Sequence, residues 1–310
     1  MTTAITHDNS SGSLLLPVGA LLLAILSFTS GASVAKQLFP VVGAEGTTAL
    51  RLSIGALMLI AVMRPWRVRF STTNWRPVVL YGLAMGGMNL LFYMSLQTVP
   101  LGIAIAIEFT GPLTVATTSS RRKIDLLWIA FAITGLLLLL PLGQATADID
   151  PLGMLYALGA GACWALYILA GRKAGRDHGA MATSLGMTVA VIAILPVGIA
   201  HAGTALFQPS VLAVAFIVAI LSSALPYSLE MLALRRLPAQ TYGTLTSGEP
   251  AAGAMVGFFL LGESLPLLQW CAIGLIIAAS VGATMTAIKG RQRPETDQEA
   301  LPANRRLTTT

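Results

Sequence analysis

Ten apolar segments, each about as long as a bilayer is thick, constrain the fold of this chain more than any other feature. They are separated by charges, prolines and polar turns, and a helix needs about 20 apolar residues to cross the hydrocarbon core. Because backbone polar groups in lipid must be satisfied within the chain, these segments are expected to be helices. The sequence predicts an all-α integral membrane protein with ten transmembrane helices, at residues 14–36, 42–63, 77–97, 100–120, 124–142, 151–172, 180–200, 210–234, 239–261 and 266–288.

The composition leaves no room for a sizeable soluble domain. Of the 310 residues, 55% are hydrophobic and 10% are charged, whereas a soluble domain carries about 25% charged residues. We expect a tail at residues 1–13, five spans within 14–142, five more within 151–288, and a polar, disordered tail at 289–310. The first tail has no cationic segment, so the first span is expected to be retained and not cleaved as a signal peptide.

The basic residues predict the orientation in the membrane. All 19 Lys and Arg residues except Lys36 and Arg51 follow an even-numbered span, so they lie on one side. Loops rich in Lys and Arg face the cytoplasm, which puts both termini there. The opposite side carries Glu45, Asp148, Asp150, His201 and Glu263. The pI of 9.7 is therefore a signal of topology, and the short, separate basic loops do not predict nucleic-acid binding.

The chain contains a weak internal repeat. The segment "SLQTVPLGIAIAIEFTGPLTVA" aligns with "ALRRLPAQTYGTLTSGEPAAGA" at an offset of 138 residues, which pairs Pro112 with Pro250 and Asp125 with Glu263. Each half then holds five spans, and because five is odd, the second half enters the membrane in the opposite sense. Inverted repeats are typical of secondary transporters, whose site lies near the midplane between the repeats.

This pattern resembles the EamA repeat of the drug/metabolite transporter superfamily. Within it, the stretches "GASVAKQLFP", "GGMNLLFYMSLQTVPLGIAIAIEFTGPL", "ALGAGACWALYIL", "LPYSLEMLALRRLP" and "GTLTSGEPA" are similar to the threonine/homoserine exporters of bacterial inner membranes. The resemblance covers the chain from about Leu14 to Ile288. It implies a basket-like fold of two inverted five-helix EamA repeats, in the inner membrane, that exports small amino acids, threonine and homoserine foremost.

Charged residues inside the predicted spans are the main candidates for a substrate site. Each costs at least about 2.5–3.5 kcal/mol at a helix centre if it is unpaired. Arg51, Glu108 and Glu249 fall near the middle of their spans, whereas Glu230 lies closer to the cytoplasm and Lys36 near the outer end of its span, where it could snorkel.

These charges allow two interpretations. An amino acid is a zwitterion, so Glu108 could accept its ammonium group and Arg51 could donate to its carboxylate. Alternatively, Arg51 forms an internal salt bridge with Glu108 or Glu249 that holds the two halves together. A bridge that opens when substrate binds would combine the two.

A proline-centred break is expected in the fourth and ninth spans. Pro112 has no N–H, which frees the carbonyl of Glu108, and Pro250 does the same for Thr246. Together with Gly111, these prolines are candidates for helix breaks at a midplane site, where freed carbonyls are tolerated if they face protein or a cavity. The alternative is a kink that serves packing alone.

Further candidates for substrate binding or gating are polar and aromatic residues that share a helix face. Asn89 and Tyr93 are four residues apart, and so are Tyr242 and Thr246, one turn before Glu249. Trp164 and Tyr167 are three residues apart, as are Tyr227 and Glu230. Each aromatic residue could equally serve packing or anchor the chain at the membrane interface.

Several motifs are absent from the sequence. It has no Walker A loop, no H-E-x-x-H and no G-x-S-x-G, so no enzyme, cofactor or metal is predicted. The alternatives are export of another amino acid, a purine or a drug-like metabolite, or an intramembrane enzyme. Protons are a candidate coupling ion, since a buried carboxyl group could carry one, but a facilitator that runs down the substrate's own gradient fits the sequence equally well. The sequence does not indicate the oligomeric state.

Overall fold

The computed structural model describes residues 12–65, 75–118, 124–139, 150–179, 181–226, 229, 233 and 245–291, and the regular structure in these ranges is helical. The first half contains α1 (Gly12–Ala35), the short η1 (Lys36–Leu38), α2 (Phe39–Met63), α3 (Arg76–Ser95), α4 (Leu101–Glu108), α5 (Thr110–Thr118) and α6 (Ile124–Leu139). The second half contains α7 (Pro151–His178), α8 (Met181–Ala202), η4 (Gly203–Phe207), α9 (Pro209–Ala219), η5 (Ile220–Ala224), α12 (Glu249–Val256), η6 (Gly257–Leu261) and α13 (Leu267–Arg291). The prediction of an all-α fold is confirmed for the described ranges.

Four helical stretches of the described chain are long and apolar enough to cross a membrane. They are Leu16–Met63, Arg76–Ser95, Pro151–His178 and Met181–Phe207. Shorter apolar helices lie at Leu101–Val115, Leu126–Gly135, Pro209–Ala224, Glu249–Leu261 and Leu267–Ala279. The first stretch covers two predicted spans, which are separated by η1 and by Gly43, whose φ of 69° interrupts the helical backbone. The structure is thus that of a membrane protein, and the full set of ten spans stays a prediction.

Helix boundaries follow local sequence signals. The side chain of Asp150 accepts a hydrogen bond from the Leu152 N–H at 3.1 Å and caps α7, whose first residue is Pro151. Proline at the first helical position is favourable because its missing N–H would have no partner there. At the other end, Gly179 takes a φ of 58°, a left-handed conformation that glycine adopts without strain. This long helix is therefore delimited by its own sequence.

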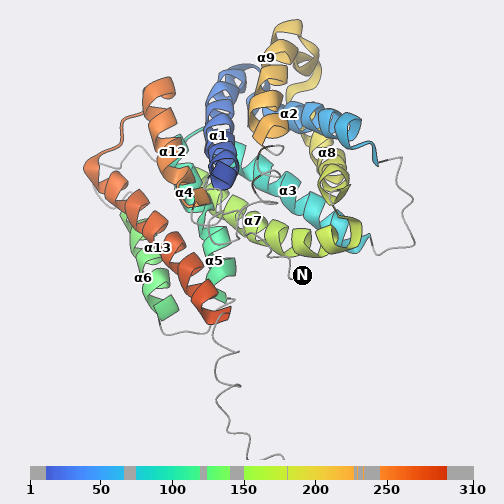
Figure 1. Cartoon of the computed structure of the whole chain (residues 1–310). Helices are drawn as coiled ribbons and strands as arrows, with labels where there is room; N and C mark the ends of the chain where they lie inside the picture. The colour runs from blue at the N-terminus through green and yellow to red at the C-terminus, as the bar shows by residue number, and fades with distance from the viewer. Residues whose placement is uncertain are drawn as a thin grey trace, which may run out of the picture.

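The two halves interlock (Figure 1). Helix α3 packs on α7 and α8, α2 packs on α8 and α9, α4 packs on α12 and α7, and α6 lies along α13. Most of the extensive helix contacts thus join one half to the other. Glycines allow the close approach: a Cβ atom on Gly102 would come within 2.6 Å of Ala254. Relative movement of the halves must therefore occur at these shared contacts.

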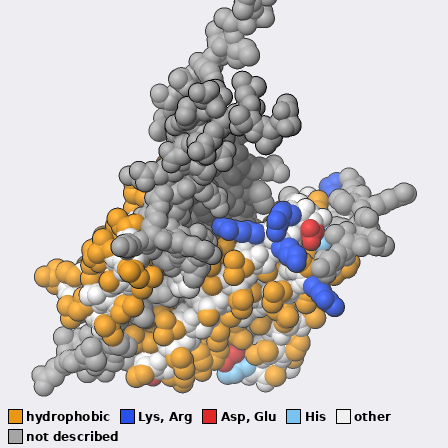
Figure 2. Space-filling model, turned by 90° about the horizontal axis from the view of Figure 1, so that it is seen from below, with side chains coloured by type: hydrophobic (Ala, Val, Ile, Leu, Met, Phe, Trp, Pro, Cys, Tyr) orange, Lys and Arg blue, Asp and Glu red, His pale blue; other side chains and the backbone are white. Residues whose placement is uncertain are grey.

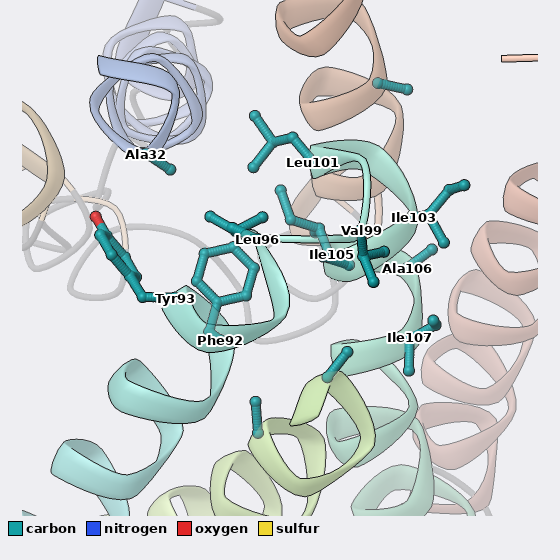
Figure 3. Close-up of a cluster of buried hydrophobic side chains, with 14 of the residues drawn as sticks. Ala32, Phe92, Tyr93, Leu96, Val99, Leu101, Ile103, Ile105, Ala106 and Ile107 are labelled. Atoms are coloured by element: carbon teal, nitrogen blue, oxygen red, sulfur yellow. The ribbon is translucent and has the colours of Figure 1, made fainter. Parts of the chain in front are cut away.

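The short helix α4 lies at the centre of the fold. All of its residues from Leu101 to Glu108 are buried. Figure 3 shows Ile105 of α4 on the side of Phe92 and Leu96, with Ile103 and Ile107 on the opposite side of the helix, while the Tyr93 hydroxyl points away from α4. Any group that α4 carries is thus fixed by packing on all sides.

The surface separates charge from apolar side chains. On the face in Figure 2, Lys and Arg side chains gather at one end, an acidic and histidine patch lies at the opposite end, and hydrophobic side chains lie between. Large apolar side chains such as Leu57, Val62, Leu126 and Ile192 are exposed. An exposed apolar band of this kind fits a lipid environment and not water.

Candidate functional site

The helix formed by α4 and α5 is interrupted at Phe109. The Phe109 N–H donates to the Ile105 carbonyl at 2.9 Å, and the Thr110 hydroxyl donates to the Ile107 carbonyl at 2.6 Å. Three residues after the break, Pro112 has no N–H to offer the Glu108 carbonyl. The break therefore leaves the backbone carbonyl of Glu108 without its helical partner. Glu108 is also the residue that carries the acidic side chain of this helix.

Two glycines let this break lie directly against α7. A Cβ atom on Gly111 would overlap the Gly161 carbonyl oxygen, and a Cβ atom on Gly161 would come within 2.7 Å of the Glu108 carbonyl oxygen. In both cases the obstructing atom is backbone, which cannot rotate away as a side chain can. The α4–α5 break and α7 thus form one backbone-to-backbone contact, and glycine is required on each side of it.

Glu108 is buried in this apolar setting. Its side chain is only 6% exposed, and it forms no ion pair and accepts no hydrogen bond from the described residues. The charges of Glu249 and Arg51 both act on it electrostatically. Glu108 therefore lies within electrostatic range of the other two charges predicted near the middle of the spans, without a direct contact to satisfy it.

Arg51 of α2 is fully buried and only partly satisfied. Its Nη1 donates to the Ser222 carbonyl at 2.9 Å, and its Cζ lies 4.9 Å from the centre of the Tyr93 ring. Its Nε and Nη2 have no hydrogen-bond partner in the part of the chain that the structure describes. These two nitrogens form one side of the guanidinium, the side that binds a carboxylate with two parallel hydrogen bonds.

The carbonyl that receives Arg51 is available because the helix is irregular. Pro226 follows Ser222 by four residues and cannot donate to its carbonyl. In the π-helical turn η5, the Leu225 N–H reaches back to the Ile220 carbonyl, so the Leu221 carbonyl accepts from Ser27 of α1 at 2.6 Å instead. The irregular turn thus offers two carbonyls to the first half of the chain.

Asn89 and Tyr93 of α3 are both buried, as expected of residues that share an inward face. The Asn89 side-chain nitrogen donates to the Met85 carbonyl at 2.7 Å. Tyr93 is fully buried beside Arg51, and none of the described residues forms a hydrogen bond with its hydroxyl. Tyr93 thus adds a second unsatisfied polar group to the Arg51 neighbourhood.

The two aromatic candidates on α7 have different surroundings. Trp164 packs edge-to-face on Phe109, at 5.4 Å between ring centres, and so lies at the helix break. Tyr167 stacks on Tyr81 at 4.7 Å, with the two hydroxyls 3.1 Å apart. Trp164 is therefore part of the Glu108 neighbourhood, whereas Tyr167 contributes to an aromatic pair between α7 and α3.

Glu249 is the first residue of α12 and is half-buried. Pro250 follows it at the start of the helix, so this break, like that at Phe109, has its proline in the first turn after the interruption. Of the other candidates, Tyr227, Glu230 and Tyr242 lie outside the described residues.

The internal salt bridge of Arg51 with Glu108 or Glu249, which is the alternative interpretation of these charges, does not occur among the described residues. Neither Arg51 nor Glu108 is in an ion pair with any residue that the structure describes. Lys36, expected to snorkel, instead pairs with Glu263 at 2.7 Å. The prediction missed this pair, because the carboxylate lies 227 residues away in the chain. It also missed Phe109 and Ser222, although a proline four residues after Ser222 is a readable signal of a freed carbonyl.

Comparison with known proteins identifies relatives over most of the chain. A sequence profile of the EamA-like transporter family matches residues 151–285. The threonine/homoserine exporter RhtA of Escherichia coli strain K12 is 54% identical over 282 residues, which are 91% of this chain and 96% of that protein. The exporter of the same name from Salmonella typhimurium strain LT2 is 54% identical over 91% of this chain and 95% of its own length.

More distant matches agree with these. An uncharacterised transporter of Bacillus subtilis, YwfM, is 28% identical over 74% of this chain and 80% of its own. One crystal structure aligns with a TM-score of 0.59 at 20% identity, over 91% of this chain and 99% of the other, which shows a shared fold. The named relatives are transporters, in agreement with the prediction that the chain is not an enzyme. Its identity to the two exporters, over nearly the full length of both partners, shows that the chain belongs to the EamA-like transporter family.

Proposed function

We propose that this chain exports threonine and homoserine across the bacterial inner membrane by alternating access. Two exporters of these amino acids match it at 54% identity over nearly their whole length, so the proposal transfers their named substrates to a chain of the same family. The alternative substrates are another amino acid, a purine or a drug-like metabolite. They differ from threonine and homoserine in the chemical groups that the site must recognise.

One observation carries the proposal: Arg51 is a fully buried guanidinium whose Nε and Nη2 have no hydrogen-bond partner among the described residues. A buried charge without a counter-ion is strongly destabilising, because it loses its hydration without compensation. A substrate carboxylate would supply the missing negative charge and two hydrogen bonds at once. Threonine and homoserine both carry this carboxylate.

The acid beside Arg51 suits the other end of a zwitterion. Glu108 has no hydrogen-bond donor among the described residues, yet the charge of Arg51 acts on it. An ammonium group bound at the Glu108 carboxylate would satisfy it. Tyr93, Asn89, Trp164 and Glu249 would complete the surroundings, and Tyr167, Tyr227, Glu230 and Tyr242 stay candidates for the same pathway.

The proposed architecture has ten spans in two inverted repeats, within residues 14–142 and 151–288, with both termini in the cytoplasm. The pattern of helix packing supports it. An offset of 138 residues relates α1 to α7, α2 to α8, α3 to α9, and α6 to α13. If each helix is replaced by its equivalent in the other half, the α3–α7 contact corresponds to α9–α1, and the α3–α8 contact corresponds to α9–α2. All four of these contacts occur in the structure.

Energy for export would come from a gradient, since the chain carries no ATP-binding motif. Glu108 is the candidate proton carrier, because a carboxyl group in an apolar site can hold a proton or an ammonium group but not both. Facilitated diffusion down the substrate gradient is the alternative, and the two differ in their response to an imposed pH gradient.

The proposal is tested by exchange in proteoliposomes. Vesicles that contain the purified protein are loaded with unlabelled homoserine, and uptake of labelled threonine is followed with and without a pH gradient. We expect exchange above protein-free vesicles, with competition by homoserine and not by purines. Correctly inserted protein that exchanges neither amino acid would refute the proposed substrate.

The Arg51 assignment is tested by a substitution that keeps the charge. Arg51→Lys removes the planar two-nitrogen fork while it preserves a cation, so exchange should fall about 30-fold, as a truncated charge-assisted bond predicts. Arg64→Lys is the matched control, because Arg64 lies on the exposed end of the same helix. Equal exchange by the two variants would exclude bidentate binding at Arg51.

A further inference from the structure

We infer that Lys36 and Glu263, together with the N–H of Leu101, form a latch that closes the acidic end of the molecule and holds the helix that carries Glu108. This inference rests on the proposed alternating access. It assigns Lys36 and Glu263 a positioning role, since their described polar contacts do not include Arg51 or Glu108.

Glu263 joins three separate parts of the chain. Its Oε1 accepts from the Lys36 Nζ at 2.7 Å, and its Oε2 accepts from the Leu101 N–H at 2.9 Å. The side chains of Lys36 and Glu263 are 23% and 15% exposed, so both are mostly shielded from solvent. The Glu263 N–H in turn donates to the Gly257 carbonyl at 3.1 Å, which fixes the loop that bears it.

The bond to Leu101 explains why this carboxylate matters for transport. The first N–H groups of a helix have no partner within the helix, and a carboxylate there is stabilised by the helix dipole. Leu101 begins α4, and Glu108 ends it seven residues later. Because α4 is one short, fully buried helix, a change at its first residue is transmitted to Glu108.

The latch connects the two halves of the chain. Lys36 and Leu101 belong to the first half and Glu263 to the second, with separations of 227 and 162 residues along the chain. A second contact joins the halves in the same way, where the His201 Nε2 lies 3.6 Å from the Glu45 Oε2. Opening of the acidic end by movement of one half against the other must break these contacts.

Gly43 provides the space for the contact between His201 and Glu45. A Cβ atom on Gly43 would come within 2.6 Å of the His201 Nε2, and Gly43 has a φ of 69° that other residues rarely adopt. Glycine thus allows His201 to reach over the start of α2. These two contacts join the halves at the acidic end, and Lys36–Glu263 is the shorter and better shielded of the two.

The test uses the chain's own thiols to measure access from each side. Cys163 is half-buried and its sulfur would be 3.2 Å from a Cβ atom on Gly87, and it interacts electrostatically with Glu108. With Cys271→Ser, Cys163 becomes the single thiol next to the proposed site. A membrane-impermeant methanethiosulfonate is then added from the acidic side or the basic side of oriented vesicles.

We expect Lys36→Met and Glu263→Gln each to raise the rate of labelling from the acidic side about tenfold. Each variant loses one charge-assisted hydrogen bond, and a loss of that size corresponds to about this change in rate. The double variant should label no faster than either single variant, because the same contact is lost only once. Labelling from the basic side should not increase. A general loss of structure would instead raise labelling from both sides.

Asp150→Asn is the matched control. Asp150 also lies at the acidic end and also caps a helix, but its partner is Leu152 in the same helix. It should leave labelling unchanged. Parental labelling rates in Lys36→Met and Glu263→Gln would overturn the latch. Thiol labelling needs no transported substrate. The latch can therefore fail this test while threonine exchange succeeds, or pass it while threonine exchange fails.

Discussion

The two helix breaks of this transporter have similar sequences but different surroundings. In each, a proline follows the interruption within the first turn of the next helix: Pro112 in α5 and Pro250 in α12. In the first break, the acid is Glu108, the last residue before the interruption, and it is 6% exposed. In the second, the acid is Glu249, the first residue after the interruption, and it is half-buried.

The breaks also differ in how tightly they are held. Gly111 lies against the backbone of α7, whereas a Cβ atom on Gly248 would meet only the Leu245 carbonyl of its own chain segment, at 3.2 Å. Glu249 starts a helix, where a negative charge is favourable. The comparison indicates that the first break is the more tightly packed and more desolvated of the two, and that the second places its acid at a helix start, where a negative charge is stabilised.

The largest expected difference between the breaks is in stability. Gly111→Ala places a methyl group into the Gly161 carbonyl, and overpacking against backbone should cost about 3 kcal/mol or more of stability. Gly248→Ala should cost less than about 1 kcal/mol. Thermal unfolding in detergent, followed by size-exclusion fluorescence, measures both. Similar midpoints for the two variants would show that the first break is not held by α7.

The second prediction compares the two acids. Glu108→Gln should lower threonine exchange on the order of 100-fold, because a desolvated charge that binds substrate is lost. Glu249→Gln should lower it about tenfold or less, because Glu249 is only half-buried and its charge is more strongly screened by solvent. Both are measured by counterflow with matched amounts of inserted protein. Normal exchange by a well-folded Glu108→Gln variant would remove the charge of Glu108 from the mechanism.

The third prediction concerns the prolines. Pro112→Ala restores an N–H that can bond the Glu108 carbonyl, so the break should tighten and displace Glu108, and exchange should fall about tenfold. Pro250→Ala should have a smaller effect, because the acid at this break, Glu249, is only half-buried and is less constrained by packing than Glu108. Initial rates of exchange compare them. A larger loss for Pro250→Ala would reverse the assignment of the more tightly packed break.

The smallest expected effect is at the aromatic contact found only in the first break. Phe109→Leu removes the edge-to-face contact with Trp164, worth about 0.5–1.5 kcal/mol, so exchange should fall only a few-fold. Trp164→Phe should keep part of it, because a smaller ring remains. The two variants are compared by KM and maximal rate. A change in KM alone would mean that Trp164 contacts substrate and does not merely support the break.

Much of the fold followed from residue pattern. The predicted span at 77–97 became α3 at Arg76–Ser95, and that at 151–172 became the start of α7. The ends of α7 were readable in Asp150, Pro151 and Gly179. These features are local, because they depend on hydrophobic length, on missing N–H groups and on allowed backbone angles, which neighbouring residues set.

The candidate site was predicted only in part. Pattern alone singled out Arg51, Tyr93 and Glu108 as polar groups inside apolar spans. In the structure, Arg51 contacts Tyr93, and Glu108 lies within electrostatic range of Arg51. The partners of these groups could not be read from the chain. The Ser222 carbonyl lies 171 residues from Arg51, and no sequence period encodes that contact.

The sequence by itself determined that this chain is an apolar, helical membrane protein, and its prolines indicated that the fourth and ninth apolar segments are interrupted. Those properties follow from composition and from proline and glycine, which act on their own neighbourhoods. Only the tertiary structure decided that Arg51 has two unpartnered nitrogens, that Gly111 meets Gly161, and that Lys36 reaches Glu263. These depend on helix crossings between distant segments, where packing of whole surfaces selects the partner.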